Sequence, residues 1–275
     1  MENITCWAFR KLCKGATDSY SGMLSASYLI KRSKAWKEVD FFPIEAQKQW
    51  LQIVTSKEKE CVELLSRLQK ELSAFPEKNA LYGIQLNASC PSSEFVNIGQ
   101  GAALIKRPGK IASLIKELLK GKYKVSLKIR LGFHSAEAKE KRILKVLEAL
   151  QKIRGPNFSH IVIHFKYAND PSYTQYNYSL LNKICEFNLP IIINGGITSS
   201  ADYKKIISAL SKNNSIKGFM AGRAALKNPD CFSPKPARSP VELLFDFKSF
   251  CEQHPPKEIY LKKIEEYCPW AKIAK

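Results

Sequence analysis

Short apolar runs alternate with longer amphipathic stretches along most of the chain. The runs are rich in Ile, Val and Leu and show little strict alternation, which is typical of parallel strands covered on both faces. We predict strands at 18–23, 50–54, 82–86, 125–129, 160–164, 189–194 and 218–221. Repeated β–α units of this kind predict either a (β/α)8 barrel or an open doubly wound sheet.

The stretches between the predicted strands have helical period. Their apolar stripes are Cys61, Leu64, Leu65 and Leu68, then Ile111, Leu114, Ile115, Leu118 and Leu119, then Ile143, Leu144, Leu147, Leu150 and Ile153. We expect Gly121 to cap the second helix, and residues 198–200 (Thr-Ser-Ser) to supply an N-cap. No G-x-G-x-x-G follows a predicted strand, which argues against an open dinucleotide-binding sheet. The pattern therefore favours an α/β fold of the TIM-barrel type.

The composition of the sequence changes after residue 232. Residues 233–240 hold three prolines in eight positions and read as a linker. Two helical patterns follow, at about 241–251 and 257–267. We therefore divide the chain into a barrel domain over 1–232 and a linker with a short helical appendage over 233–275, which is too short for a core of its own.

The charge of the chain is strongly positive. Its 275 residues include 44 Lys and Arg against 25 Asp and Glu, a formal net charge of +19. Residues 233–275 carry 8 basic and 6 acidic side chains, so the first 232 residues hold 19 − 2 = +17. An excess of this size on a globular domain points to a polyanionic partner, with nucleic acid ahead of a membrane surface. The alternative is that the lysines only solvate helices.

Several classes of protein do not fit the sequence. No long apolar run is available to span a membrane, and no basic segment followed by an apolar one opens the chain. The eight cysteines form no C-x-x-C pair, and the four histidines have no metal-ligand spacing. We expect a soluble, cytoplasmic, monomeric protein without disulfides or a metal.

Polar and small residues gather where the predicted strands end, which is where active sites lie in barrels of this type. From the predicted strand at 50–54 to the one at 218–221 these residues are Gln52, then Asn87 with Cys90, Lys128 with Arg130, His164 with Lys166, Asn194 with Gly195 and Gly196, and Gly222 with Arg223. We predict that they form one site.

The glycines of the last two strand ends suit a phosphate. Gly195 and Gly196 let backbone N–H groups approach an anion, and Gly222 with Arg223 repeats this arrangement one strand later. With Lys128 and Gln52 in the barrel mouth, such a site would suit flavin mononucleotide, FMN. The alternatives are that the glycines merely terminate strands and that Gln52 is a hydrogen-bonded core amide.

Four sequence motifs, in this order, resemble the tRNA-dihydrouridine synthase family. They are Asn-Ala-Ser-Cys-Pro at 87–91, Lys-Ile-Arg-Leu-Gly at 128–132, Ile-Asn-Gly-Gly-Ile at 193–197 and Met-Ala-Gly-Arg-Ala-Ala-Leu-Lys-Asn-Pro at 220–229. Residues 5–10 and 51–53 are also similar to segments of that family. Each motif alone is weak, but together they extend along the whole predicted barrel.

The resemblance implies an FMN enzyme that reduces the C5–C6 double bond of a tRNA uridine, with NADPH or NADH as reductant. It assigns flavin contacts to Gln52, Lys128, His164, Asn194, Gly195, Gly196, Gly222 and Arg223. It places Asn87, Arg130 and Lys166 beside the uridine, and it makes Cys90 the acid that protonates C5. Cysteine thiols are mostly protonated at pH 7, which suits a proton donor. A stacked uridine must also leave its stack to reach such a site.

The sequence departs from the family pattern in several places. Glu94 and Asn97 stand where lysines usually follow the Cys-Pro. Lys166 replaces the arginine of a His-x-Arg, so a single ammonium stands in place of a guanidinium that can make two parallel hydrogen bonds. Gly196 stands where an acidic residue is usual. The C-terminal part is shorter than the family's helical bundle, and residue 1 aligns with the end of the family's first strand. We therefore expect a barrel whose first strand is truncated.

Two other interpretations stay open from the sequence. A dihydroorotate- or dihydropyrimidine-dehydrogenase-like flavoenzyme has a similar Asn-x-Ser-Cys-Pro, although a small substrate does not require a charge of +19. A flavin-free RNA-binding barrel is the other. The flavin content of the purified protein distinguishes the flavin-free barrel from the two flavoenzymes. The tRNA dependence of flavin reoxidation distinguishes the tRNA-dihydrouridine synthase from the small-molecule dehydrogenase.

Overall fold

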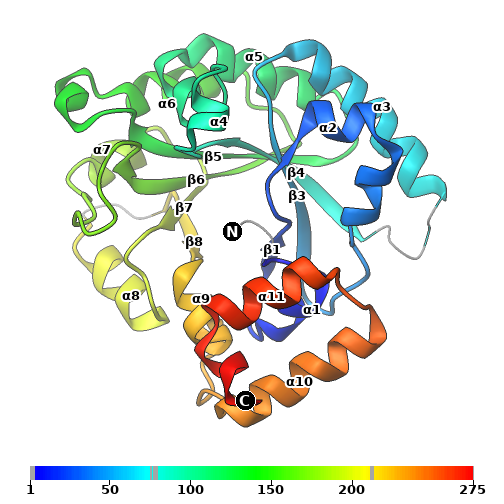
Figure 1. The fold of residues 1–275 in the computed structure, drawn as a ribbon. Coiled ribbons are helices and arrows are strands. Elements are labelled where there is room, and N and C mark those ends of the chain that lie inside the picture. The colour runs from blue at the N-terminus through cyan, green and yellow to red at the C-terminus, as the bar shows by residue number, and fades with distance from the viewer. Residues whose placement is uncertain (1–3, 75, 77–79, 211–213, 275) are drawn as a thin grey trace.

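A parallel β-sheet curls around the centre of the molecule, and most of the helices lie on its outer side (Figure 1). The computed structural model describes residues 4–74, 76, 80–210 and 214–274. The strands are β1 (Asp18–Tyr20), β2 (Leu24–Ser25), β3 (Lys48–Val54), β4 (Leu81–Ala88), β5 (Lys124–Gly132), β6 (Phe158–Tyr167), β7 (Ile191–Asn194) and β8 (Ile216–Met220). Their order around the sheet is β1-β3-β4-β5-β6-β7-β8, with β2 also paired to β3. Strands that follow chain order in this way are the hallmark of a (β/α)8 barrel.

The sheet curls without closing. Among the described residues, β1 pairs only with β3 and β8 only with β7, and no strand joins β1 to β8. The predicted α/β barrel is therefore confirmed in an incomplete form, with its opening between the two outer strands.

Helices lie between the strands and toward both ends of the described chain. They are α1 (Trp7–Leu12), α2 (Ala26–Lys31), α3 (Glu58–Ala74), α4 (Ser93–Val96), α5 (Pro108–Leu118), α6 (Arg142–Gln151), α7 (Leu181–Cys185), α8 (Ser200–Ser208), α9 (Arg223–Lys227), α10 (Pro240–Gln253) and α11 (Glu258–Tyr267). Short 3-10 helices span Ser33–Glu38, Gly101–Lys106, Ser135–Glu140, Pro229–Phe232 and Pro269–Ala274. The apolar stripes predicted three of these helices, α3, α5 and α6, correctly.

The ends of the helices agree with the predicted caps in one case and not in the other. Ser199 caps α8, because its side chain accepts a hydrogen bond from the backbone N–H of Asp202. The predicted cap at Gly121 is wrong. The α5 helix ends at Leu118 with Leu119 as its C-cap, and Gly121 lies in the turn beyond, where its N–H donates to the Leu118 carbonyl.

The C-terminal helices share a core with the N-terminal segment. Leu243 and Phe247 of α10, Ile264 of α11 and Trp270 pack in one apolar cluster with α1 and α9. Figure 1 shows these helices grouped beside the opening of the barrel. Trp270 donates its indole N–H to the Leu226 carbonyl at 2.9 Å, which ties the tail to α9. The tail thus has no core of its own, as expected, and the domain boundary at 232 stays a prediction.

Candidate active site

The strand register places the polar strand-end residues side by side. Asn87 of β4 is the neighbour of Lys128 on β5. One step closer to the strand ends, Arg130 of β5 is opposite His164 of β6, and His164 is opposite Asn194 of β7. Because all of these strands are parallel, their carboxyl ends meet at one rim of the curled sheet. The site predicted from scattered segments is therefore assembled in space.

Cys90 lies on the loop after β4, and Asn87 holds that loop. The Asn87 side-chain oxygen accepts hydrogen bonds from the backbone N–H groups of Ser89, at 2.9 Å, and Cys90, at 3.0 Å. The side chain of Cys90 is half-buried. Two backbone contacts at one acceptor fix the direction in which the Cys90 thiol leaves the chain.

Two cations of β5 hold the same loop from the other side. Arg130 donates through Nε to the Ser89 carbonyl at 2.8 Å and through a terminal nitrogen to the Tyr167 carbonyl at 2.9 Å. The Lys128 ammonium donates to the Ser89 hydroxyl at 3.3 Å. Ser89, which sequence reasoning did not single out, thus links Cys90 to both cations.

Gln52 belongs to a row of polar side chains inside the barrel. Its amide donates to the Gln85 side chain at 2.7 Å and accepts from the Asn87 amide at 2.9 Å, while Gln85 donates to Ser126 at 2.8 Å. The register makes Gln52, Gln85 and Ser126 neighbours on β3, β4 and β5. Sequence reasoning missed Gln85 and Ser126, although both are polar residues at equivalent positions of apolar runs. Through Gln52, the row holds the side chain of Asn87 in place. One amide hydrogen of Gln52 stays available to another acceptor.

Four cationic side chains converge on the rim, and within the described residues none of them pairs with a carboxylate. They are Lys128, Arg130, Lys166 and Arg223. Burial, with repulsion from Arg130 as the next cause, lowers the pKa of Lys128 to about 7. Burial also lowers the pKa of Arg130. Cations held only by neutral oxygens are the expected partners of an anionic ligand.

His164 is neutral at physiological pH. Burial, followed by repulsion from Lys128 and Arg130, lowers the pKa of its imidazole to about 3. Its Nδ1 lies 2.8 Å from the side-chain oxygen of Asn194, which fixes the proton on Nδ1. Asn194 in turn donates to the Met220 carbonyl at 2.8 Å and so joins β7 to β8. The imidazole therefore keeps Nε2 as an acceptor.

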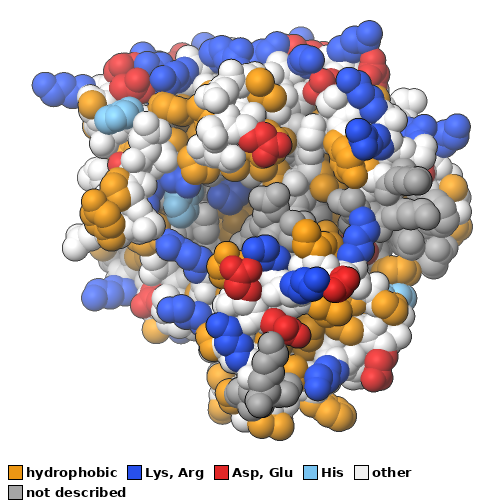
Figure 2. Space-filling model, viewed as in Figure 1, with side chains coloured by type: hydrophobic (Ala, Val, Ile, Leu, Met, Phe, Trp, Pro, Cys, Tyr) orange, Lys and Arg blue, Asp and Glu red, His pale blue; other side chains and the backbone are white. Residues whose placement is uncertain are grey.

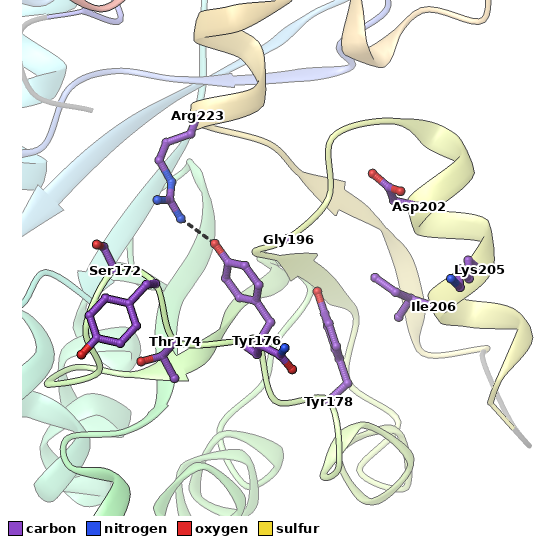
Figure 3. Close-up of a pocket in the computed structure, with 11 residues that line it drawn as sticks. Ser172, Thr174, Tyr176, Tyr178, Gly196, Asp202, Lys205, Ile206 and Arg223 are labelled. Atoms are coloured by element: carbon purple, nitrogen blue, oxygen red, sulfur yellow. Dashed lines mark hydrogen bonds between the residues drawn. The ribbon is translucent and has the colours of Figure 1, made fainter.

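Gly195 and Gly196 form a bare backbone surface at the end of β7. Their φ angles are 112° and 67°, a region that favours glycine. A tyrosine that the sequence analysis missed, Tyr176, lies against both glycines, and its hydroxyl is 2.6 Å from a terminal nitrogen of Arg223 (Figure 3). Gly222 is the N-cap residue of α9, directly before Arg223. Both predicted phosphate loops thus meet at Tyr176.

Lys166 holds the loop that carries Tyr176. Its buried ammonium donates to the backbone carbonyl of Ser172 at 2.8 Å and lies 4.7 Å from the centre of the Tyr176 ring. The structure therefore gives Lys166 a positioning contact, and its predicted contact with a substrate stays a prediction.

Lys and Arg side chains surround the face shown in Figure 2 and outnumber the acidic ones there. In the described part of the chain, no helix is long and apolar enough to cross a bilayer. The same residues contain no group of three or more side chains suited to a metal ion. The face is therefore a basic one.

Comparison with known proteins shows the family of this chain. A sequence model described as dihydrouridine synthase matches residues 1–267. The chain belongs to the dihydrouridine synthase family. The resemblance seen in the motifs is thereby confirmed.

Several curated relatives are named as tRNA-dihydrouridine synthases. The chain is 27% identical over 179 residues to a probable tRNA-dihydrouridine synthase of Staphylococcus aureus strain MRSA252, a match over 64% of this chain and 52% of the relative. It is 28% identical over 165 residues to a probable tRNA-dihydrouridine synthase of Staphylococcus epidermidis strain ATCC 12228, over 59% and 48%. An uncharacterised tRNA-dihydrouridine synthase-like protein of Caenorhabditis elegans is 26% identical over 155 residues, over 55% and 50%. The chain thus spans about half the length of the curated relatives it matches.

Proposed function

We propose that this protein is a tRNA-dihydrouridine synthase that binds FMN, takes reducing equivalents from NADPH or NADH, and acts on tRNA as a cytoplasmic monomer. The observation that carries the proposal is the set of four cations at the rim that also holds Cys90, none of which pairs with a carboxylate of the described residues. Membership of the family supplies the reaction class. A flavin phosphate and the tRNA backbone are anions of the kind that such a rim attracts.

The residues present fit an FMN molecule. A Cβ added to Gly195 or Gly196 would lie 2.4 or 2.7 Å from the nearest ring carbon of Tyr176, so the ring fills a space beside these glycines that exists only because they lack side chains. We propose that this space, with Gly222 and Arg223, takes the phosphate. Lys128, the free Nε2 of His164, Asn194 and the remaining amide hydrogen of Gln52 would face the polar edge of the ring.

FMN, when bound, would supply hydride transfer between the nicotinamide cofactor and C6 of the uracil. Cys90 would hold the proton destined for C5, on a loop fixed by Asn87 and Arg130. Lys128, with its pKa lowered to about 7, would provide a positive charge that strengthens as an anion approaches. Asn87 and Arg130 would then orient the uridine, and the rim would exclude water around it.

Reoxidation of the reduced flavin tests this function. The purified protein is loaded with FMN, reduced with NADPH without oxygen, and mixed with tRNA that lacks modifications. The proposal predicts reoxidation that depends on tRNA and leaves dihydrouridine in it. Reoxidation by free uracil or orotate in place of tRNA would instead indicate a small-molecule dehydrogenase. A protein that takes up no FMN would overturn the proposal.

A further inference from the structure

Tyr176 stands at the point where the proposed phosphate residues meet. Its ring packs against Gly195 and Gly196, closely enough that a Cβ on either glycine would lie 2.4 or 2.7 Å from a ring carbon. Its hydroxyl takes a hydrogen bond from Arg223, with an oxygen–nitrogen distance of 2.6 Å. The His164 ring meets it edge-on at a centroid distance of 5.6 Å. One side chain therefore covers most of the surface that a phosphate would need.

A phosphate and Tyr176 compete for this surface. An anion must approach the backbone nitrogens of Gly195 and Gly196 to within about 3 Å to accept their hydrogen bonds. The Tyr176 ring packs against the same two residues. Arg223 likewise offers the same nitrogen to the phenol that it would offer to the phosphate. A phosphate makes charge-assisted, bidentate contacts with a guanidinium, whereas a phenol gives one neutral contact, so the phosphate is the stronger partner.

The surroundings of Tyr176 allow its side chain to move. It belongs to residues 168–180, which form no helix or strand between β6 and α7. The backbone is held on both sides, by Lys166 at the Ser172 carbonyl and by the Asn177 N–H at the Phe165 carbonyl, at 2.9 Å. An open cavity of about 540 Å³, which Tyr176 itself lines, lies between this loop and α8 (Figure 3). The ring can therefore leave the glycines without unfolding the loop.

We propose that Tyr176 occupies the phosphate position of the FMN site in the empty protein, and that the FMN phosphate displaces it into the neighbouring cavity. This inference rests on the proposed function. Because only the fraction of molecules with Tyr176 displaced is competent to bind, Tyr176 lowers the affinity for FMN. It therefore sets how readily the protein loads and loses its cofactor.

Equilibrium binding of FMN and riboflavin to flavin-free protein, followed by flavin fluorescence, tests the inference. Tyr176→Ala should bind FMN about tenfold more tightly than wild type, the worth of one hydrogen bond to a charged group. Tyr176→Phe keeps the ring but loses the bond to Arg223, so its FMN affinity should rise by a smaller factor. Riboflavin has no phosphate, so its affinity should change much less. Phe245→Ala, at a 73% exposed residue of α10 that does not line the cavity, is the control and should match wild type.

The outcomes separate the inference from the function on which it rests. Weaker FMN binding by Tyr176→Phe would make the hydroxyl a phosphate ligand and would overturn the inference, while leaving the FMN enzyme in place. Equal FMN affinity in wild type and Tyr176→Ala, with both unfolding at the same temperature, would also overturn it. Absence of FMN binding in wild type and every variant would overturn the proposed function, and the inference with it.

Discussion

The side-chain oxygen of Asn87 accepts a hydrogen bond from the backbone N–H of Cys90 at 3.0 Å. Asn87 therefore acts as a local turn residue that holds the proposed proton donor, in addition to any contact with a substrate. Its amide nitrogen is bound to Gln52, so the position of Cys90 depends on a row of polar groups that runs into the barrel.

Replacing Asn87 by Ala should destabilise the protein and misplace the Cys90 loop. The change removes the acceptor of two backbone N–H groups and the donor to Gln52, which should lower the free energy of unfolding by about 1–3 kcal/mol. Urea denaturation measures this loss. Asn87→Asp keeps the acceptor and should lose less. Equal stability of the Ala variant and wild type would show that the loop does not depend on Asn87.

Replacing Cys90 by Ala should separate the two halves of the proposed reaction. The thiol is proposed to meet only the uracil, so the variant should keep its FMN spectrum and be reduced by NADPH at close to the normal rate. Dihydrouridine formation should fall by roughly 10²- to 10⁴-fold, the usual worth of a positioned general acid. Single-turnover measurements of each half-reaction check this. Wild-type reduction of tRNA by the variant would remove Cys90 from the mechanism.

Lys128 should make stability depend on pH. Its pKa falls from 10.5 to about 7 on folding, so between these values the unfolded chain binds more protons than the folded one. Stability from this group therefore rises as the pH increases from 7 toward 10.5, with a slope of at most about 1.4 kcal/mol per pH unit. The contribution is lost as the pH falls toward 7.

The comparison with Lys128→Met isolates that effect. Urea denaturation of both proteins at pH values between about 7 and 9 should show wild type gaining stability relative to the Met variant, which lacks the titrating group. Parallel curves for the two proteins would mean that Lys128 is not buried as a neutral amine in this range. FMN binding should weaken the trend, because an anion favours the charged ammonium and raises the pKa of Lys128 toward its unfolded value.

Binding of tRNA should depend strongly on salt and rest on the barrel. Residues 1–232 carry +17 of the +19 net charge. If about six phosphates are neutralised, affinity should fall on the order of a hundredfold or more between about 50 and 200 mM salt. Filter binding at several salt concentrations measures the slope. Lys262→Gln in the exposed tail should leave that slope unchanged, and a flat response in wild type would mean that the charge only solvates the protein.

The strands and the rim of the barrel could be predicted from sequence because they depend on local patterns. Apolar runs located the strands from β3 to β8, and the rule that active sites lie at strand ends brought Asn87, Lys128, His164 and Arg223 to one rim. The bounds of the strand predicted at 18–23 were wrong, because β1 ends at Tyr20 and the separate strand β2 covers Leu24–Ser25, and both are too short to leave a recognisable pattern.

The contacts inside the site depend on which side chains meet across strands and loops, and periodicity does not carry that information. Gln85 completes the row with Gln52 only through the register of β3 and β4. Tyr176 reaches Arg223 from a loop 47 residues earlier in the chain, so no local motif connects them. The pairing of Gln85 with Gln52 could have been predicted from polar residues at equivalent positions of neighbouring strands. The contact between Tyr176 and Arg223 could be found only from the structure.

The most direct test of the proposed activity is to map dihydrouridine in tRNA from cells that lack this gene. We predict that at least one dihydrouridine site is lost, that the wild-type gene restores it, and that the Cys90→Ala gene does not. Retention of every dihydrouridine site in the cells that lack the gene would contradict the proposed tRNA-dihydrouridine synthase activity.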